Sequence, residues 1–212
     1  MYLTRHGDMI ANVDLSTPIV IAGAGSIGSY ACLALAKLGY TNITVFDDGI
    51  VEEENIAPQF YTKRCLGKLK VERLKRAINE LTGTSIVAMP CRIDDATYSL
   101  ATTNTLVCAV DSMSARKAIF NEVTYTNFVD ARMAIEFLTI ISFRLEFEKY
   151  ENTLFADSFS VQEPCTNKAI SYTSLIAGGL VSKAVLDLHK STNATFFRTV
   201  NFDINNFDMV VL

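Results

Sequence analysis

Short apolar runs alternate with helical patterns through the first two thirds of the chain. Apolar segments short enough to be buried strands occupy residues 18–22, 42–46, 85–89, 105–110 and 127–129. Between them, the spacing of apolar positions predicts helices over residues 26–38, 68–81 and 114–124. Strands that alternate with helices are typical of βαβ units and a parallel sheet. The pattern therefore predicts an α/β fold that is Rossmann-like and doubly wound, with a mainly parallel sheet.

The pattern changes after residue 130. Residues 135–147 are partly alternating, which predicts antiparallel strands, and the C-terminal segment predicts a hairpin that turns at Asn205–Asn206. Residues 150–164 are polar and irregular, as in a loop. Residues 169–188 have about the length of a membrane span, but Lys183 and Asp187 favour a buried core helix instead. No linker or repeat interrupts the pattern, so we expect a single domain over residues 1–212.

The net charge, the cysteines and the N-terminal segment each bear on the class of protein and on its location. The net charge of −4 makes a nucleic-acid binder an unlikely class, because such proteins are usually basic. The five cysteines show no C-x-x-C spacing, which indicates a reducing compartment and no structural zinc. The N-terminal segment is polar and lacks a secretory apolar stretch. We therefore expect a cytoplasmic chain without membrane association.

The segment GAGSIG lies between the first predicted strand and the first predicted helix. In such a turn Gly23 permits the tight bend, Gly25 lets the backbone approach a phosphate, and Gly28 allows the helix to pack closely on the strand. Ser26 and Ile27 begin the helix, whose N–H groups and dipole favour an anion. The segment predicts a phosphate-binding turn.

Two acidic residues follow the second predicted strand. Asp47 stands 19 positions beyond Gly28 and would accept hydrogen bonds from a ribose, with Asp48 beside it. The turn and Asp47 together predict a nucleotide site, but they fit NAD as well as ATP. Taken alone, they favour a NAD-dependent oxidoreductase.

The residues after Asp47 are more specific. An aspartate is followed by V-E-E-E-N, by a glutamine four residues past the asparagine, and by G-K-L-K at residues 67–70. This succession resembles the ubiquitin-activating-like adenylyltransferases of the ThiF/MoeB superfamily, over about residues 4–188. The resemblance implies ATP as the nucleotide, with Asp47 on the ribose, Asn55 and Gln59 along the sugar and α-phosphate, and Lys70 at the outer phosphates. A NAD-dependent enzyme gives no reason for the last three residues.

Two further residues match that superfamily. Asp111 follows the strand at 105–110 and precedes S-x-x-x-R, which ends in Arg116. The resemblance implies that Asp111 binds the Mg²⁺ that bridges the phosphates, since Mg²⁺ is typically held by one or two carboxylates together with phosphates and waters. Asp111 could also be the N-cap of the following helix. Arg5 resembles an arginine that reaches the ATP of a partner subunit, which implies a homodimer.

The resemblance also implies a reaction. In the superfamily, the C-terminal carboxylate of a ubiquitin-like or sulfur-carrier protein attacks the α-phosphate of ATP and forms an acyl-adenylate and pyrophosphate. We expect the chain to be an adenylyltransferase of this kind. Cys165 precedes the apolar helix, as the transfer cysteine does in some relatives, and could take the acyl group as a thiolate. An ordinary loop cysteine is an equal alternative.

Other interpretations remain open at this point. Relatives commonly carry an arginine where Pro58 stands. Three alternatives follow: Lys63 or Arg64 replaces its charge, the activity is weakened, or the chain is a non-catalytic ATP-binding partner subunit. Residues 63–76 hold seven basic side chains and one acid, which permits a tRNA-modifying member of the same superfamily. His189 is interpreted as a cation at the C-terminal end of the apolar helix.

Overall fold

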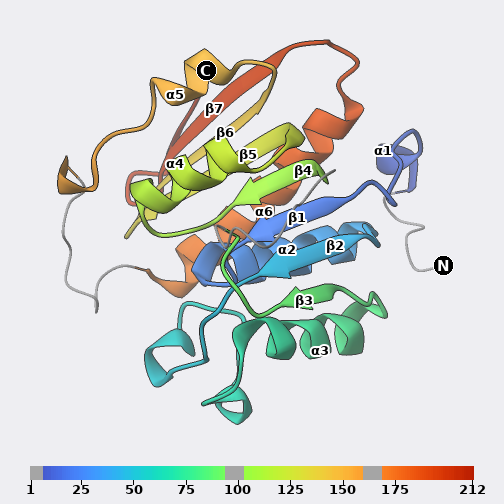
Figure 1. Cartoon of the computed structure of the whole chain (residues 1–212), viewed down its shortest axis with the longest axis vertical. Helices are drawn as coiled ribbons and strands as arrows, with labels where there is room; N and C mark the ends of the chain where they lie inside the picture. Colours follow the sequence, from blue (N-terminus) through green and yellow to red (C-terminus); the bar gives the residue numbers. More distant parts are fainter. Residues whose placement is uncertain (1–6, 94–102, 160–168) are drawn as a thin grey trace.

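A computed structural model of the chain describes residues 7–93, 103–159 and 169–212 (Figure 1). The predicted α/β pattern is present, and helix α2 has the predicted bounds. In chain order the helices and strands are α1 (Gly7–Ile10), β1 (Ile19–Ala22), α2 (Ser26–Leu38), β2 (Ile43–Phe46), α3 (Lys70–Thr82), β3 (Val87–Met89), β4 (Thr103–Cys108), α4 (Met113–Glu122), β5 (Tyr125–Ala134), β6 (Phe137–Arg144), α5 (Phe147–Glu151), α6 (Ser171–Lys190), β7 (Phe196–Asp203) and β8 (Asp208–Val211). Three short 3-10 turns, η1 (Glu53–Asn55), η2 (Lys63–Cys65) and η3 (Asp157–Phe159), lie in the connections.

The described strands form one sheet in the order β3-β2-β1-β4-β5-β6-β7-β8. Strand β1 pairs in parallel with both β2 and β4, and Ile19 faces Ile43 on one side and Thr105 on the other. The chain thus builds outward from β1 to β3 and then returns to the other side of β1. The pairs β5–β6, β6–β7 and β7–β8 are antiparallel. This confirms the doubly wound, mainly parallel sheet with antiparallel C-terminal strands. The strand order reverses between β1 and β4, and ligands bind at the carboxyl ends of the strands at such a point.

Helices cover both faces of the sheet (Figure 1). Apolar residues of α2, α3 and α6 share one core with the sheet, including Leu35, Leu74 and Val181. On the other face, α4 and α5 enclose a second core, in which aromatic rings from α4, α5, β5 and β6 pack in tilted or stacked pairs. The segment at 169–188 is therefore a core helix, as predicted. In the described part of the chain, no helix combines the length and the apolar character that a membrane crossing requires.

Helices α2 and α6 approach each other at a glycine. A Cβ atom on Gly178 would lie 2.6 Å from the Cβ of Tyr30 and 2.7 Å from its carbonyl carbon. Contacts this short do not occur between real Cβ atoms, so only glycine fits at this crossing. The crossing fixes α6 directly against the helix that follows the glycine turn.

Most predicted bounds are shifted by one or two residues, and two regions differ by more. Strand β5 extends well beyond residues 127–129, because the charges of Asp130 and Arg132, which interrupt its apolar pattern, are paired inside the protein. The segment from residue 150 is not irregular at its start: Tyr150 belongs to α5 and is fully buried in the aromatic core. The hairpin at the C-terminus turns where it was predicted, between β7 and β8.

His189 does not act as a charged partner of the α6 dipole. Its ring nitrogens lie 2.8 Å from the hydroxyl of Tyr40 and 2.7 Å from the hydroxyl of Thr105. Burial, together with the nearby positive charge of Arg144, lowers the pKa of His189 to about 4, so the ring is neutral at pH 7. Besides Lys190 in the last turn, Arg144 supplies a positive charge at this helix end and donates to the carbonyl oxygens of Leu188 and Asn193.

A neutral buried histidine makes stability depend on pH. The unfolded chain binds a proton at His189 below pH 6.5, whereas the folded chain does not until about pH 4. We therefore expect the free energy of unfolding to fall as the pH drops from 6.5 toward 4, with a slope from this group of at most about 1.4 kcal/mol per pH unit. Urea unfolding at several pH values measures the slope. It should flatten between pH 6.5 and 5 in His189→Gln and persist in His6→Gln; equal slopes in both variants would contradict the assignment.

Candidate functional site

The glycine turn between β1 and α2 depends on two close approaches. Gly23 has φ = 98°, and a Cβ atom there would lie 2.7 Å from the carbonyl oxygen of Ala109. A Cβ on Gly28 would lie only 1.9 Å from the carbonyl oxygen of Gly23. By contrast, among the residues that the structure describes, no atom beyond the chain neighbours lies within 4 Å of a Cβ built on Gly25, which is the N-cap of α2. The backbone is thus tightly packed at Gly23 and Gly28. It is accessible at Gly25, immediately before Ser26 and Ile27 at the start of α2.

The peptide groups of the turn are held from both sides at Ala24. Its N–H donates to Asp47 Oδ2 (2.7 Å), and its carbonyl oxygen accepts from the buried hydroxyl of Tyr61 (2.7 Å). The other oxygen of Asp47 accepts from the N–H of Gly49 (2.8 Å). Asp47 therefore ties the turn to the end of β2, and each carboxylate oxygen keeps further acceptor capacity for a ligand.

The connection after β2 carries the predicted amide side chains. Asn55 is buried, and its Oδ1 accepts from the N–H of Glu52 (3.0 Å) in a capping box of η1. Its carboxamide nitrogen can donate two hydrogen bonds. In the described part of the chain, the buried Oε1 atom of Gln59 has no hydrogen-bond partner. The N–H of Phe60 donates to Ser29 Oγ (3.1 Å), which anchors this connection to α2.

Lys70 and Asp47 converge beside Gly49. A Cβ on Gly49 would lie 2.9 Å from Asp47 Oδ1 and 3.4 Å from Lys70 Nζ. The N–H of Lys70 also donates to the carbonyl oxygen of Gly49 (2.9 Å), which fixes the start of α3 against the end of β2. Asp48 is exposed and forms an ion pair with Arg92 (2.9 Å) at the same edge of the sheet.

Asp111 lies at the neighbouring strand end. It is exposed and stands two residues beyond Ala109, whose carbonyl oxygen faces Gly23. The alternative role predicted for Asp111, as N-cap of the next helix, is wrong: the N-cap of α4 is Ser112, whose hydroxyl accepts from the N–H of Ala115 (3.2 Å). The fold thus brings the glycine turn, Asp47, Lys70 and Asp111 to one edge of the sheet, where the strand order reverses between β1 and β4.

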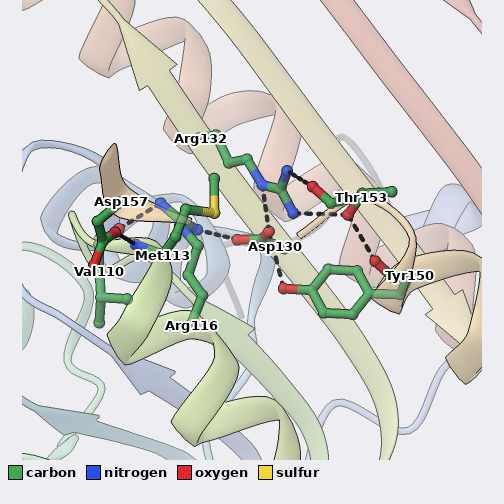
Figure 2. A network of polar contacts seen from close by, with 8 residues as sticks. All are labelled: Val110, Met113, Arg116, Asp130, Arg132, Tyr150, Thr153 and Asp157. Carbon is green, nitrogen blue, oxygen red and sulfur yellow. Dashed lines mark hydrogen bonds and ion pairs between the residues drawn. The ribbon is translucent and has the colours of Figure 1, made fainter. Parts of the chain in front are cut away.

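A buried charged network that the sequence pattern does not predict contacts Val110, the residue before Asp111 (Figure 2). Arg116 of α4 donates to Asp130 Oδ1 and to the carbonyl oxygen of Val110. The other oxygen of Asp130 accepts from Arg132 Nε (2.7 Å) and from the hydroxyl of Tyr150 (3.1 Å). Asp130 is fully buried, and Arg116 is 4% exposed. The network therefore connects the β4–α4 junction to β5 and α5.

The segment after α5 contacts the other side of the α4 N-terminus. Asp157 Oδ1 accepts from the N–H of Met113 (2.7 Å), and hydrogen bonds from Ser114 and Met113 lower the pKa of this exposed carboxyl. A cavity of about 380 Å³ lies between this segment and α4, lined by Met113, Ser114, Lys117, Leu154, Phe155, Ala156 and Asp157. The cavity is next to the helix that Asp111 precedes, but it is separate from the space in front of Gly25.

Two predicted site residues, Arg5 and Cys165, lie outside the described residues. Lys63 and Arg64, considered as substitutes for the missing charge at Pro58, are exposed on η2. Within the described ranges, Cys32 and Cys108 are fully buried, and burial raises the pKa of both thiols. These two thiols are thus poor nucleophiles at neutral pH.

Residues 14–210 match the ThiF family, so the chain belongs to that family. It is 29% identical over 107 residues to the NEDD8-activating enzyme E1 catalytic subunit of Caenorhabditis elegans, covering 49% of this chain and 25% of that protein. It is 27% identical over 128 residues to the adenylyltransferase and sulfurtransferase UBA4 of Debaryomyces hansenii, covering 58% and 29%. The chain thus spans between a quarter and a third of the length of these curated relatives.

Solved structures show the same fold at low sequence identity. The microcin C7 biosynthetic enzyme MccB in complex with N-formylated MccA has a TM-score of 0.70 and 15% identity, with 93% of this chain and 64% of that chain covered. PaaA has a TM-score of 0.69 and 15% identity, with the same coverage. A structure of Escherichia coli MccB with ATP has a TM-score of 0.65 and 14% identity, with 93% and 63% covered.

Gly28 and Gly25 of the turn should respond differently to one added methyl group. Gly28→Ala forces a Cβ into the carbonyl oxygen of Gly23, and we expect it to lower the free energy of unfolding by at least about 3 kcal/mol, the upper range for overpacking. Gly25→Ala meets open space and should cost no more than about 1 kcal/mol, the scale of an N-cap change. Urea unfolding of both variants compares them, and equal losses would contradict the geometry of the turn.

Proposed function

We propose that this chain is an ATP-dependent adenylyltransferase that activates the C-terminal carboxylate of a ubiquitin-like or sulfur-carrier protein. The observation that carries the proposal is the convergence of Lys70 and Asp47 beside Gly49, next to the open space in front of Gly25. Membership of the ThiF family supports it, as do relatives named as a NEDD8-activating enzyme and as an adenylyltransferase. The catalytic domain is proposed to comprise residues 1–212.

The residues present fit ATP. Triphosphate oxygens would lie at the N-terminus of α2, where the backbone of Gly25 is accessible and the helix dipole favours negative charge. The ribose hydroxyls would donate to Asp47, which retains acceptor capacity, and the unpartnered Oε1 of Gln59 would accept a further hydrogen bond. Asn55 would donate from its carboxamide nitrogen. Asp48 would contribute at the rim of the same site, where it pairs with Arg92.

The chemistry follows from charge and position. The incoming carboxylate oxygen forms a bond to the α-phosphorus in line with the bond that breaks, and pyrophosphate leaves with its electron pair. Lys70 would neutralise charge on the outer phosphates, and the N–H groups of α2 would hold the phosphates in place. Asp111 would hold Mg²⁺ together with phosphate oxygens and waters, and the ion would supply charge neutralisation there.

Partners and the later thiol step are part of the same proposal. Arg5 would reach the phosphates of a second copy, which makes the functional unit a cytoplasmic homodimer. Cys165 would receive the activated acyl group as a thioester, with AMP as the leaving group. The names of solved MccB structures, with ATP and with MccA, support a nucleotide and a second substrate meeting on this fold.

Adenylation is tested by exchange of labelled pyrophosphate into ATP in the presence of candidate ubiquitin-like and sulfur-carrier proteins. We expect exchange to depend on Mg²⁺ and on a free C-terminal carboxylate, and to fall at least about a hundredfold in Asp111→Ala, the scale for losing one preorganised electrostatic group. Asp8→Ala is the matched control, because Asp8 is an exposed aspartate on α1. Binding of NAD but not ATP would overturn the proposal, and ATP binding without exchange would favour a non-catalytic partner subunit.

The variant Cys165→Ala tests the thiol step separately from adenylation. We expect this variant to retain pyrophosphate exchange but to form no covalent, thiol-sensitive adduct with the activated carrier, because the alanine side chain has no nucleophile. Mass spectrometry of the intact protein after incubation with ATP and carrier detects the adduct. Cys65→Ala is the control, since Cys65 is a partly exposed cysteine. An adduct that persists in Cys165→Ala would remove Cys165 from the mechanism.

A further inference from the structure

Asp111 lies between two residues, Val110 and Met113, whose backbone groups form hydrogen bonds with side chains. On one side, Arg116 donates to the carbonyl oxygen of Val110, the residue immediately before Asp111. On the other side, Asp157 accepts from the N–H of Met113 at 2.7 Å, two residues after Asp111. Figure 2 shows both contacts at the start of α4. The exposed Asp111 side chain thus extends from a short segment whose two ends are fixed.

The hydrogen bond from Arg116 to Val110 is itself stabilised by further buried contacts. Arg116 cannot leave this carbonyl oxygen easily, because its guanidinium is buried and also paired with the fully buried Asp130. Asp130 is in turn held by Arg132, which donates to the carbonyl oxygen and hydroxyl of Thr153, each at 2.9 Å. Thr153 begins the short segment that leads to Asp157. Both ends of the Asp111 segment are therefore fixed by one connected structure.

We propose that Arg116 and Asp157 are positioning residues that hold the Asp111 segment in the geometry needed to bind a divalent cation with a nucleotide. This inference rests on the proposed role of Asp111 in the adenylation site. Its physical basis is that a single carboxylate binds Mg²⁺ together with phosphate only if its oxygens are placed to within a fraction of an ångström. An exposed side chain on an unrestrained strand–helix connection does not meet that requirement by itself.

Arginine is required at position 116 for geometric reasons. Its planar fork reaches an acid and a carbonyl oxygen at the same time, whereas a lysine ammonium has one nitrogen and a different reach. Arg116→Lys therefore keeps a positive charge beside the buried Asp130, which avoids leaving that carboxylate unpaired, but gives up one of the two contacts. Arg144→Lys is the matched control: Arg144 also holds carbonyl oxygens, those of Leu188 and Asn193, but at the end of α6.

The test measures ATP binding by calorimetry with and without Mg²⁺, using the full chain. We expect Arg116→Lys to reduce the gain in ATP affinity that Mg²⁺ provides by about tenfold, a mid-range coupling for residues in one network, with affinity in EDTA unchanged. Arg144→Lys should keep the full gain. In an Asp111→Asn background, Arg116→Lys should have no further effect, because it acts only through Asp111.

Asp157→Ala provides a second variant, because Asp157 is exposed and its loss should not prevent folding. It should reduce the Mg²⁺-dependent gain in the same direction, and it decides the question if Arg116→Lys does not fold. A full gain in both variants, or an equal loss in Arg144→Lys, would overturn the positioning role while leaving adenylation intact. If the wild-type chain shows no gain from Mg²⁺, or if Asp111→Asn keeps it, the metal-binding part of the proposed function fails and this inference fails with it.

Discussion

The carbonyl oxygen of Gly23 lies 1.9 Å from where a side chain on Gly28 would begin, and this contact sets the position of helix α2. Because the helix must start directly on the turn, its first N–H groups face the space at the ends of β1 and β4. Asp47 and Tyr61 hold the intervening peptide of Ala24 from two sides. The geometry of the proposed phosphate-binding turn is therefore set by backbone packing.

Near Asp111, buried charges rather than backbone packing fix the arrangement of the chain. Burying Asp130 between two guanidinium groups requires the desolvation of three charges, and such clusters rarely add net stability. Removing one member would leave an uncompensated charge, so the cluster specifies one arrangement of the β4–α4 junction, β5 and α5. A backbone contact thus orders the glycine turn of the proposed site, and buried ion pairs order the strand–helix junction that carries Asp111.

The sequence predicted the parts of the molecule that depend on neighbours along the chain. The strand, turn and helix from residue 19 to residue 38 follow from local periodicity and glycine positions, and the edge that carries Asp47, Lys70 and Asp111 follows from parallel strand order. The network around Asp130 could not be predicted, because Arg116 and Tyr150 are 14 and 20 residues away from Asp130 in sequence and a charge within an apolar run normally ends a strand. Ser112 replaced Asp111 as N-cap because Ser112 is closer to the first helical residue, a distinction that propensity does not resolve.

Gly178 allows α6, near the C-terminal end of the chain, to contact α2, the helix that follows the glycine turn. Since α6 contacts the backbone of α2 at Tyr30, neither helix can open locally without disturbing the other. A ligand that holds the first turn of α2 would therefore slow amide hydrogen exchange along the buried stretch of α6. Occupancy of the glycine turn would thus be visible as protection in α6, on the protein face opposite the buried charges of Asp130.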